Sequence, residues 1–249
     1  MIYEEHIAKA ARKYPKFLKG KRVMVVGPAG YLVGSGKGAE IDAHDVVVRL
    51  NNSFPLPAEL REDIGSRTDV LYHTCGRIKK ILNRVGNGAD GIEILQKDGV
   101  RWLVAKHHPF RASFKNKAKT QRFLAANEGR IQTLCVVPRI LGRIQQNLMG
   151  TDPNMGTLAI AHLLRTSVEE LSICGIDFGA SGYYPGYTLA PGYSWNETRT
   201  RVLKSGGEKK KRGPHDKQKQ IRFLARLFEG DGRVKIDERL RTVLERGRE

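Results

Sequence analysis

The stretch GPAGYLVGSGKGAEIDAHDVVVRLNN, residues 27–52, contains five glycines in its first half and an apolar run in its second half. An apolar run, RVMVVG (residues 22–27), leads into it, and DVVVRLN (residues 45–51) lies near its end. Continuous apolar runs of this length are typical of buried parallel strands. The stretch therefore predicts a strand, a glycine-rich turn and a second strand of an α/β sheet, with a ligand site near the turn.

Neither of the two common nucleotide motifs fits these glycines. Started at Gly27, the dinucleotide fingerprint has Ala29 in place of its second glycine, and started at Gly34 it lies well past the end of the strand. A P-loop fails because Gly38 follows Gly36-Lys37 where Ser or Thr is needed. The glycines thus predict close backbone approach and amides free to bind an anion.

The rest of the chain alternates apolar runs with helical patterns. This alternation predicts one α/β domain over residues 1–249, with a mostly parallel sheet flanked by helices and ligands at the carboxyl ends of its strands. Further strands are expected at 69–75, 100–106, 133–138, 170–178 and 233–236, and helices at 5–19 (within an N-terminal helical segment, 1–20), from Asn154 or Thr157 to 167, at 216–229 and at the C-terminus.

One long segment shows neither the helical nor the strand periodicity of hydrophobic residues. Residues 179–214 are rich in Gly, Pro, Tyr and Lys, and structureless segments of that length in compact domains are uncommon unless they serve function. We expect a flexible active-site loop.

Composition narrows the choice of partner and compartment. The net charge of +18 favours an anionic partner, whether nucleic acid, a sugar nucleotide or an acidic membrane. No apolar stretch is long enough for a membrane span, and the N-terminus is charged throughout, so we expect a soluble, cytoplasmic protein. The three cysteines, Cys75, Cys135 and Cys174, are widely spaced and indicate buried thiols and neither a disulfide framework nor a zinc site.

Two long motifs and one short one carry a resemblance. VVGPAGYLVGSGKGAEIDAHDVVVRLNN (25–52), followed by IGSRTDV, resembles the large donor-binding motif of the eukaryotic-type sialyltransferases, glycosyltransferase family 29. PNMGTLAIAHLLRTSVEELSICGIDF (153–178) resembles the second motif of that family. HDKQKQ (215–220) matches the last motif at its histidine, and all three occur in family order.

The resemblance implies an enzyme with a GT-A-like, Rossmann-related domain. Such an enzyme moves a nonulosonic acid, sialic acid or a Kdo-like sugar, from its CMP conjugate to a glycan hydroxyl, with inversion and without a metal or other cofactor. Its partners are a CMP-sugar donor and a glycan or glycolipid acceptor. The basic surface adds a peripheral contact with an anionic membrane. Two alternatives stay open: a non-catalytic CMP-sugar binder, and a basic nucleic-acid-binding protein that lacks any recognised nucleic-acid motif.

The same resemblance assigns candidate site residues. His215 is the candidate general base, because a neutral imidazole accepts a hydroxyl proton near neutral pH. Asn51, at the end of a strand, would hold the nucleotide, and the amides at the start of the helix after Asn154 would bind phosphate. The candidate CMP-sugar contacts are Gly27, Gly30, Asn51, Asn154, Gly156, Thr157, Gly175, Tyr183 and Tyr184.

Several positions depart from the family pattern. Pro28 and Tyr31 stand where the first motif has asparagines, and Gln220 stands where an acid follows the base. The family has a phosphate-stabilising histidine between its second and last motifs, but no histidine occurs from Phe178 to Pro214. Tyrosines of that interval, or the Lys and Arg of residues 209–212, are the candidate replacements.

Overall fold

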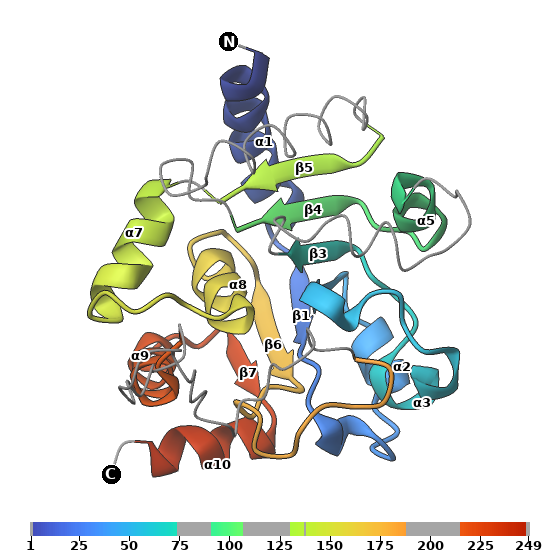
Figure 1. Ribbon diagram of the computed structural model, residues 1–249, viewed down its shortest axis with the longest axis vertical. Coiled ribbons are helices and arrows are strands. Elements are labelled where there is room, and N and C mark those ends of the chain that lie inside the picture. The colour runs from blue at the N-terminus through green and yellow to red at the C-terminus, as the bar shows by residue number, and fades with distance from the viewer. Residues whose placement is uncertain (1, 74–90, 107–129, 137, 188–214, 248–249) are drawn as a thin grey trace, which may run out of the picture.

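The computed structural model describes residues 2–73, 91–106, 130–136, 138–187 and 215–247. These residues form a seven-stranded sheet in the order β5-β4-β3-β2-β1-β6-β7, in which every neighbouring pair is parallel (Figure 1). The strands are β1 (Arg22–Val26), β2 (Val46–Leu50), β3 (Val70–His73), β4 (Trp102–Ala105), β5 (Gln132–Cys135), β6 (Glu170–Cys174) and β7 (Val234–Ile236).

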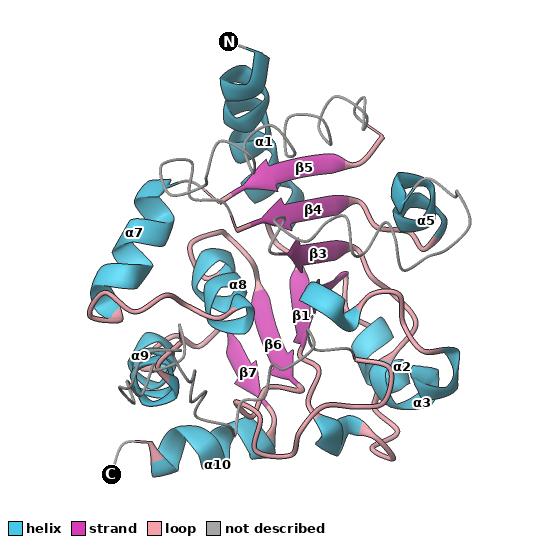
Figure 2. Cartoon of the chain, in the orientation of Figure 1, coloured by secondary structure: helices cyan, strands magenta, loops and turns pink. Residues whose placement is uncertain are grey.

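Helices connect the strands and cover both faces of the sheet (Figure 2). The α-helices are α1 (Ile2–Leu18), α2 (Gly38–Asp42), α3 (Arg61–Ile64), α5 (Gly91–Lys97), α7 (Pro138–Asn147), α8 (Met155–Leu163), α9 (Lys217–Phe228) and α10 (Glu238–Arg246), and the 3-10 turns are η1 (Gly30–Leu32), η2 (Asn51–Ser53) and η3 (Ala58–Leu60). All the predicted strands form, each within its predicted run except β5, which begins one residue earlier, at Gln132. The expected α/β class is confirmed, with a sheet that is parallel throughout.

The two faces of the sheet bury different helices. Alternate strand residues such as Val23, Val48 and Tyr72 pack with α1, α7, α8, α9 and α10 in the larger core. The opposite strand residues, such as Met24 and Val47, pack with η1, α2 and α3 in a smaller core. The continuous apolar runs in the sequence follow from this double coverage, because both sides of each strand are buried.

The strand order fixes where a ligand can bind. The chain adds strands from β1 outward to β5 on one side, then returns to place β6 and β7 on the other side of β1. The order therefore reverses between β1 and β6, and ligands of open parallel sheets bind outside the carboxyl ends at such a point. Among the described residues, no helix is both long and apolar enough to cross a membrane.

Candidate functional site

The turns that follow β1 and β6 are in direct backbone contact. The Gly27 amide donates to the Cys174 carbonyl at 2.8 Å, and the Ala29 amide donates to the Gly175 carbonyl at 3.0 Å. A Cβ at Gly27 would clash with the Gly175 carbonyl oxygen, and a Cβ at Gly175 would clash with the Gly27 carbonyl. Gly175 also has a φ of 71°, which disfavours other residues. The two predicted motifs thus meet where the strand order reverses.

The segment after β6 continues alongside the first glycine loop. The Gly30 amide donates to the Gly182 carbonyl at 3.1 Å, and Ala29 forms an isolated antiparallel bridge with Tyr183. Tyr183 is half-buried and its ring stacks on Tyr187 at 4.7 Å. The amides of Gly27 and Gly30 are therefore already used within the fold, and close approach of the two segments accounts for both glycines.

Tyr184 does not lie where a phosphate contact was expected. Its side chain is 2% exposed and packs in the smaller core. Its hydroxyl lies close enough to the buried Arg49 and Ser53 for both to lower the pKa of the phenol, although burial has the larger effect and raises it. The expectation that Tyr184 donates to a ligand phosphate is thus contradicted, because the strand-end loop and β2 cover the hydroxyl.

The glycines farther along the loop hold an anion of the protein itself. The Gly34 amide donates to Asp63 Oδ2 at 2.8 Å, and the Gly36 amide donates to Asp63 Oδ1 at 2.9 Å. These amides lower the pKa of the Asp63 carboxyl. The prediction that this loop leaves its amides free for a ligand anion is therefore wrong for Gly34 and Gly36, since an aspartate just ahead of the end of α3 occupies them.

Tyr31, which stands at a family asparagine position, also binds within the fold. Its hydroxyl accepts a hydrogen bond from the Gly175 amide at 2.7 Å and donates a short one to the Asp237 carboxylate. Asp237 follows β7 and caps α10 by accepting from the Leu240 amide at 2.8 Å. Tyr31 therefore connects the turns after β1, β6 and β7.

The start of α8 lies between the carboxyl ends of β2 and β6. An ideal Cβ on Gly156 would lie 3.3 Å from Ile176 Cδ1 and 3.6 Å from Leu50 Cδ1. Asn51, directly after Leu50, has a φ of 49°, in the left-handed region that asparagine tolerates better than most residues. The structure therefore brings Asn51, Gly156 and the segment after Gly175 together at this edge of the sheet.

Asn154 is the residue that caps α8. Its Oδ1 accepts a hydrogen bond from the Thr157 amide at 2.8 Å, so Asn154, and not Thr157, begins the helix. The capped Thr157 amide is engaged, which contradicts its expected role as a phosphate donor. Met155 and Gly156 supply the first two amides of the helix, and these have no acceptor within it.

Gln220 fastens this helix start to α9. Its Oε1 accepts from the Asn154 amide at 2.8 Å, and its Nε2 donates to the Asp216 carbonyl at 3.3 Å. The side chain is fully buried. The neutral amide that replaces the acid of the family motif thus keeps an acceptor for the Asn154 amide and adds a donor.

His215 lies beside the same turn, just before α9. Its Nδ1 is hydrogen-bonded to the Asp152 carbonyl at 2.7 Å. Because a carbonyl only accepts, Nδ1 carries the proton and the Nε2 of a neutral ring carries the lone pair. Burial lowers the pKa of His215 and the Lys106 ammonium lowers it further, while the Asp152 carbonyl and carboxylate oppose both. The ring is therefore neutral near pH 7 and able to accept a proton.

A lysine that the sequence analysis did not single out completes this cluster. Lys106, directly after β4, donates to Asp152 Oδ2 at 2.8 Å and to the Pro153 carbonyl at 2.6 Å. Its side chain is 11% exposed. The available signal in the sequence was the position of Lys106 as the last residue of the predicted strand 100–106.

His44, His162 and Asp42 make contacts within the fold. His44 is 8% exposed and its ring is hydrogen-bonded to the Glu40 carbonyl at 3.0 Å. His162 is 6% exposed and binds the Tyr72 hydroxyl at 2.9 Å, and burial lowers its pKa to about 4. Asp42 accepts from the Ser66 amide at 2.7 Å. Cys135 and Cys174 are buried thiols, as expected.

Some predictions lie outside the described residues. These include Cys75, most of the expected 179–214 loop, and the Lys and Arg of residues 209–212. Within the described ranges, no three His, Cys, Asp or Glu side chains gather in a way that could hold a metal ion.

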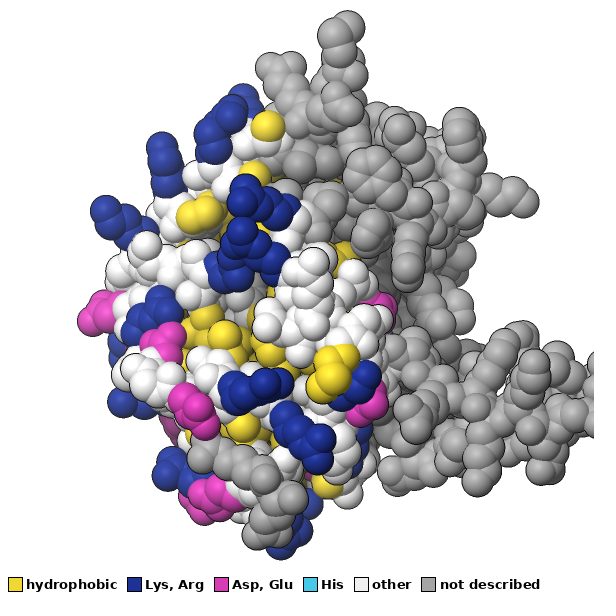
Figure 3. Space-filling model, turned by 90° about the vertical axis from the view of Figure 1, so that its left-hand side faces the viewer, with side chains coloured by type: hydrophobic (Ala, Val, Ile, Leu, Met, Phe, Trp, Pro, Cys, Tyr) yellow, Lys and Arg dark blue, Asp and Glu magenta, His cyan; other side chains and the backbone are white. Residues whose placement is uncertain are grey.

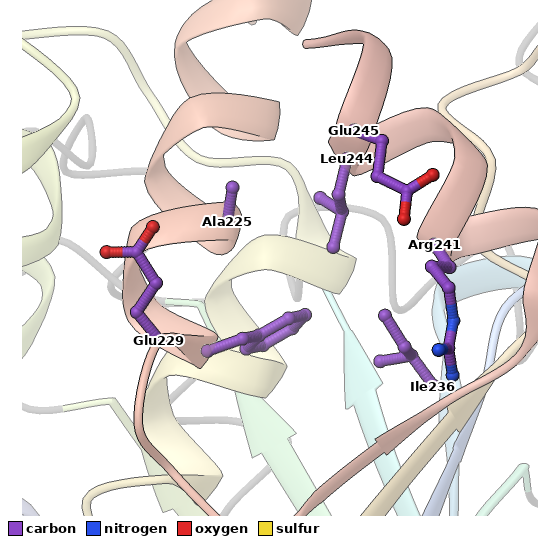
Figure 4. Close-up of a pocket in the computed structure, with 7 residues that line it drawn as sticks. Ala225, Glu229, Ile236, Arg241, Leu244 and Glu245 are labelled. Carbon is purple, nitrogen blue, oxygen red and sulfur yellow. The ribbon is translucent and has the colours of Figure 1, made fainter. Parts of the chain in front are cut away.

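A separate hollow lies between α9, β7 and α10 (Figure 4). It has a volume of about 170 Å³ and shares no lining residue with the predicted site. The ends of Ala225, Leu244 and Ile236 point into it, with Glu229, Glu245 and Arg241 around the rim. Its walls are mostly apolar, and Arg241 is the one cation among its lining residues.

Together, the fold and the strand-end cluster define an α/β protein that places a neutral histidine beside the turn leading into the amino end of α8. The family model of glycosyltransferase family 29 (sialyltransferase) matches residues 5–230, so the chain belongs to that family.

Individual relatives are more distant. The chain is 33% identical over 85 residues to the type 2 lactosamine alpha-2,3-sialyltransferase of Mus musculus. The aligned segment covers 34% of this chain and 25% of that protein. The aligned segments span only 12% to 25% of the curated relatives' own lengths.

Solved structures share the fold. A mammalian sialyltransferase in complex with Gal-beta-1-3GalNAc-ortho-nitrophenol has a TM-score of 0.53 at 17% identity, covering 90% of this chain and 72% of that one. The sialyltransferase CstII from Campylobacter jejuni, in complex with the substrate analogue CMP-3FNeuAc, has a TM-score of 0.52 at 10% identity, covering 87% and 81%. At these identities the likeness shows the fold alone.

Proposed function

We propose that this chain is a metal-independent, inverting glycosyltransferase with a single GT-A-like domain. It transfers a nonulosonic acid, sialic acid or a Kdo-like sugar, from its CMP conjugate to a hydroxyl of a glycan or glycolipid. The observation that carries the proposal is the placement of His215 at the turn that leads into the capped start of α8. Residues 152–156 thereby supply both the carbonyl that holds the candidate base and the amides of the candidate phosphate site.

Family membership supports the reaction class and the donor. The family is that of the sialyltransferases, and one protein with the same fold was solved with a CMP-linked sialic acid analogue. Another was solved with a disaccharide derivative, which supports a glycan acceptor. Sialic acid is therefore the first donor to test, and a Kdo-like sugar the second.

The transfer is a displacement at the anomeric carbon. The acceptor oxygen forms a bond to that carbon as the bond from the carbon to the CMP phosphate oxygen breaks, and CMP leaves with the electron pair. The acceptor proton passes to Nε2 of His215, which is the basic nitrogen while Nδ1–H donates to the Asp152 carbonyl. Burial of the ring and the nearby Lys106 ammonium keep it neutral until the proton arrives.

The leaving phosphate would meet the amino end of α8. The amides of Met155 and Gly156 point out of the first turn, and the helix dipole places partial positive charge there. Asn51, at the end of β2, is adjacent and would hold the nucleotide. Stabilising charge where it develops on the leaving group is a large contribution in group transfer.

A non-catalytic CMP-sugar binder is the alternative, and one observation favours it. The Tyr31 hydroxyl, at a family asparagine position, is engaged by Gly175 and Asp237. One side chain that could contact the donor is therefore used to hold the turns together. The two functions differ in whether the sugar is transferred.

Nucleotide selectivity is the first test. Thermal unfolding is measured with CMP, AMP, GMP and NAD at equal concentration. At a concentration about 100 times Kd, CMP stabilises the fold by about 2.7 kcal/mol and raises Tm, and the other nucleotides do not. Equal shifts with all four would contradict a cytidylate site.

Turnover is the second test. CMP-sialic acid and CMP-Kdo are each supplied with a panel of glycans, and release of CMP and of glycosylated product is measured. His215→Ala should lower turnover by about 10²- to 10⁴-fold while CMP still raises Tm. Donor binding without transfer in the wild type would select the non-catalytic binder, and full activity of His215→Ala would remove His215 as the base.

We propose further that the basic surface holds the protein against an anionic membrane that carries the acceptor. Lys and Arg side chains are spread over the face shown in Figure 3, and the chain carries a net charge of +18. Binding to vesicles with and without anionic lipid, at rising salt, tests this. An electrostatic contact should require anionic lipid and should weaken as salt screens the charges. Equal binding to neutral and anionic vesicles would therefore contradict the proposal. The cytoplasmic location stays a prediction.

A further inference from the structure

The turn from Asp152 to Asn154 is held from several sides. The Asp152 carboxylate accepts from Lys106 Nζ at 2.8 Å through one oxygen and from Gln145 Nε2 at 3.1 Å through the other. Lys106 also donates to the Pro153 carbonyl at 2.6 Å. The backbone carbonyl of Asp152 is the group that contacts His215 Nδ1. One residue thus faces the lysine with its side chain and the histidine with its backbone.

Lys106 is a costly residue to place here unless it has a role. Its side chain is 11% exposed, and burial lowers its pKa although the Asp152 carboxylate raises it. Long charged side chains are seldom buried unless paired. A hydrophobic residue at the end of β4 would avoid the desolvation cost, whereas Lys106 spans from β4 to the loop that begins α8.

We infer that Lys106 is a positioning residue for His215, which it serves by anchoring the Asp152 turn and by keeping a positive charge near the imidazole. The inference rests on the proposed role of His215 as general base. Lys106 touches neither the acceptor nor the transferred group in this account. It acts through Asp152, and nothing in the family motifs matched above includes it.

The charges around His215 predict in which direction each substitution should shift its pKa. Among the described residues, Lys106 and Asp152 are the charged groups that move the pKa of His215, in opposite directions. Asp216, the neighbour of His215 in the chain, caps α9 by accepting from the Lys219 amide at 3.1 Å. Removing the Lys106 charge should raise the pKa of His215, and removing the Asp152 charge should lower it.

The test compares matched variants by NMR. Lys106→Met removes the ammonium and keeps a side chain of similar length. Asp152→Asn removes the carboxylate charge and keeps the backbone carbonyl. Histidine resonances are followed against pH, with His215→Gln to assign the signal. The pKa of His215 should rise by about 0.5 to 1 unit in Lys106→Met and fall by a similar amount in Asp152→Asn.

Two further variants serve as controls. Lys106→Arg keeps the charge and should shift the pKa less than Lys106→Met. Lys21→Met makes the same substitution directly before β1, at the amino ends of the strands, and should leave the pKa of His215 unchanged. Equal shifts in Lys21→Met and Lys106→Met would indicate net charge alone and overturn the inference.

Activity gives the second readout. In Lys106→Met the acid limb of the pH–rate profile should move to higher pH with the pKa, and kcat on the plateau should fall about tenfold because the ring is less well oriented. An unchanged pKa and an unchanged profile in Lys106→Met, with wild-type turnover intact, would overturn the positioning role alone. A wild type that binds CMP without turnover would instead overturn the proposed function, while the NMR titration would still decide whether Lys106 controls His215.

Discussion

The two halves of the strand-end edge are built by different means. Where the turns after β1 and β6 meet, the contacts are backbone to backbone, and Gly27 and Gly175 are required because a Cβ at either would clash. Around the start of α8, polar side chains make the contacts: Asn154 caps the helix, Gln220 holds Asn154 and Lys106 holds Asp152. The first half is a backbone scaffold, and the second presents a histidine and a helix start.

This difference changes what a glycine-rich loop signifies. The amides of Gly34 and Gly36 bind Asp63, and those of Gly27 and Gly30 bind backbone carbonyls after β6. None of these four amides is left for a ligand in the structure. The amino end of α8, where the amides of Met155 and Gly156 have no acceptor within the helix, is therefore the part of this edge that we propose for anion binding.

Gly27→Ala should produce the largest effect on the scaffold half. The new Cβ would clash with the Gly175 carbonyl, so we expect a loss of about 3 kcal/mol or more in the free energy of unfolding. Urea denaturation measures this. Gly142→Ala, in α7 with no atom within 4 Å of the new Cβ, is the control and should stabilise by about 0.5 to 1 kcal/mol. Similar stability of the two variants would contradict the close contact.

Acid should weaken the packing of α8 through His162. Burial lowers the pKa of His162 to about 4 from an ordinary value of 6.5, so the unfolded chain binds the proton first as the pH falls. The contribution is complete above pH 6.5 and is lost toward pH 4, by about 2 kcal/mol between pH 7 and pH 5. Unfolding free energies at these two pH values are compared for the wild type and His162→Gln. An equal loss in the variant would rule out His162 as the source.

Tyr31→Phe should show whether the Tyr31 hydroxyl stabilises the fold or contacts the ligand. The variant leaves the Gly175 amide without the hydroxyl that accepts from it, and we expect a loss of about 1 to 3 kcal/mol in the free energy of unfolding. CMP affinity, measured by calorimetry, should change by less than about twofold, which corresponds to well under 1 kcal/mol. A large loss of affinity at unchanged stability would place Tyr31 in the donor site and erase the distinction between the halves.

Substitutions of Asn154 test the region around the start of α8, with the smallest expected change in stability. Asn154→Ala removes the cap of α8 and should cost about 1 kcal/mol. Asn154→Asp keeps a capping oxygen and should preserve stability, yet its negative charge should weaken CMP binding by repelling the phosphate. Parallel loss of stability and affinity in both variants would mean that Asn154 acts only as a cap.

Much of the fold could be predicted from the sequence because each strand is a continuous apolar run. Val46–Leu50 and Glu170–Cys174 fall within the predicted segments, and parallel pairing follows from the helices between them. The meeting of Asn51, Gly156 and Gly175 at one edge also follows, because carboxyl ends of parallel strands share an edge.

The details of the site could not be predicted, since they depend on partners distant in sequence. Asp63 occupies the Gly34 and Gly36 amides from 27 to 29 residues away, and nothing local to the glycine loop reveals it. Tyr184 reads as a surface loop tyrosine, but packing against β2 buries it. Lys106 is the last residue of a predicted strand, and nothing local to it reveals that its ammonium binds Asp152, 46 residues away.

A chain of two hydrogen bonds connects α1 to α8 through Tyr72. The Tyr14 hydroxyl of α1 bonds the Tyr72 hydroxyl at 3.1 Å, and Tyr72 bonds His162 on α8. Tyr14 and the Trp102 ring also meet edge to face at 4.9 Å. Trimming the first 18 residues would thus hydrate the His162 imidazole and return its pKa toward 6.5, so a shortened protein should lose less of its free energy of unfolding between pH 7 and pH 5 than the full chain.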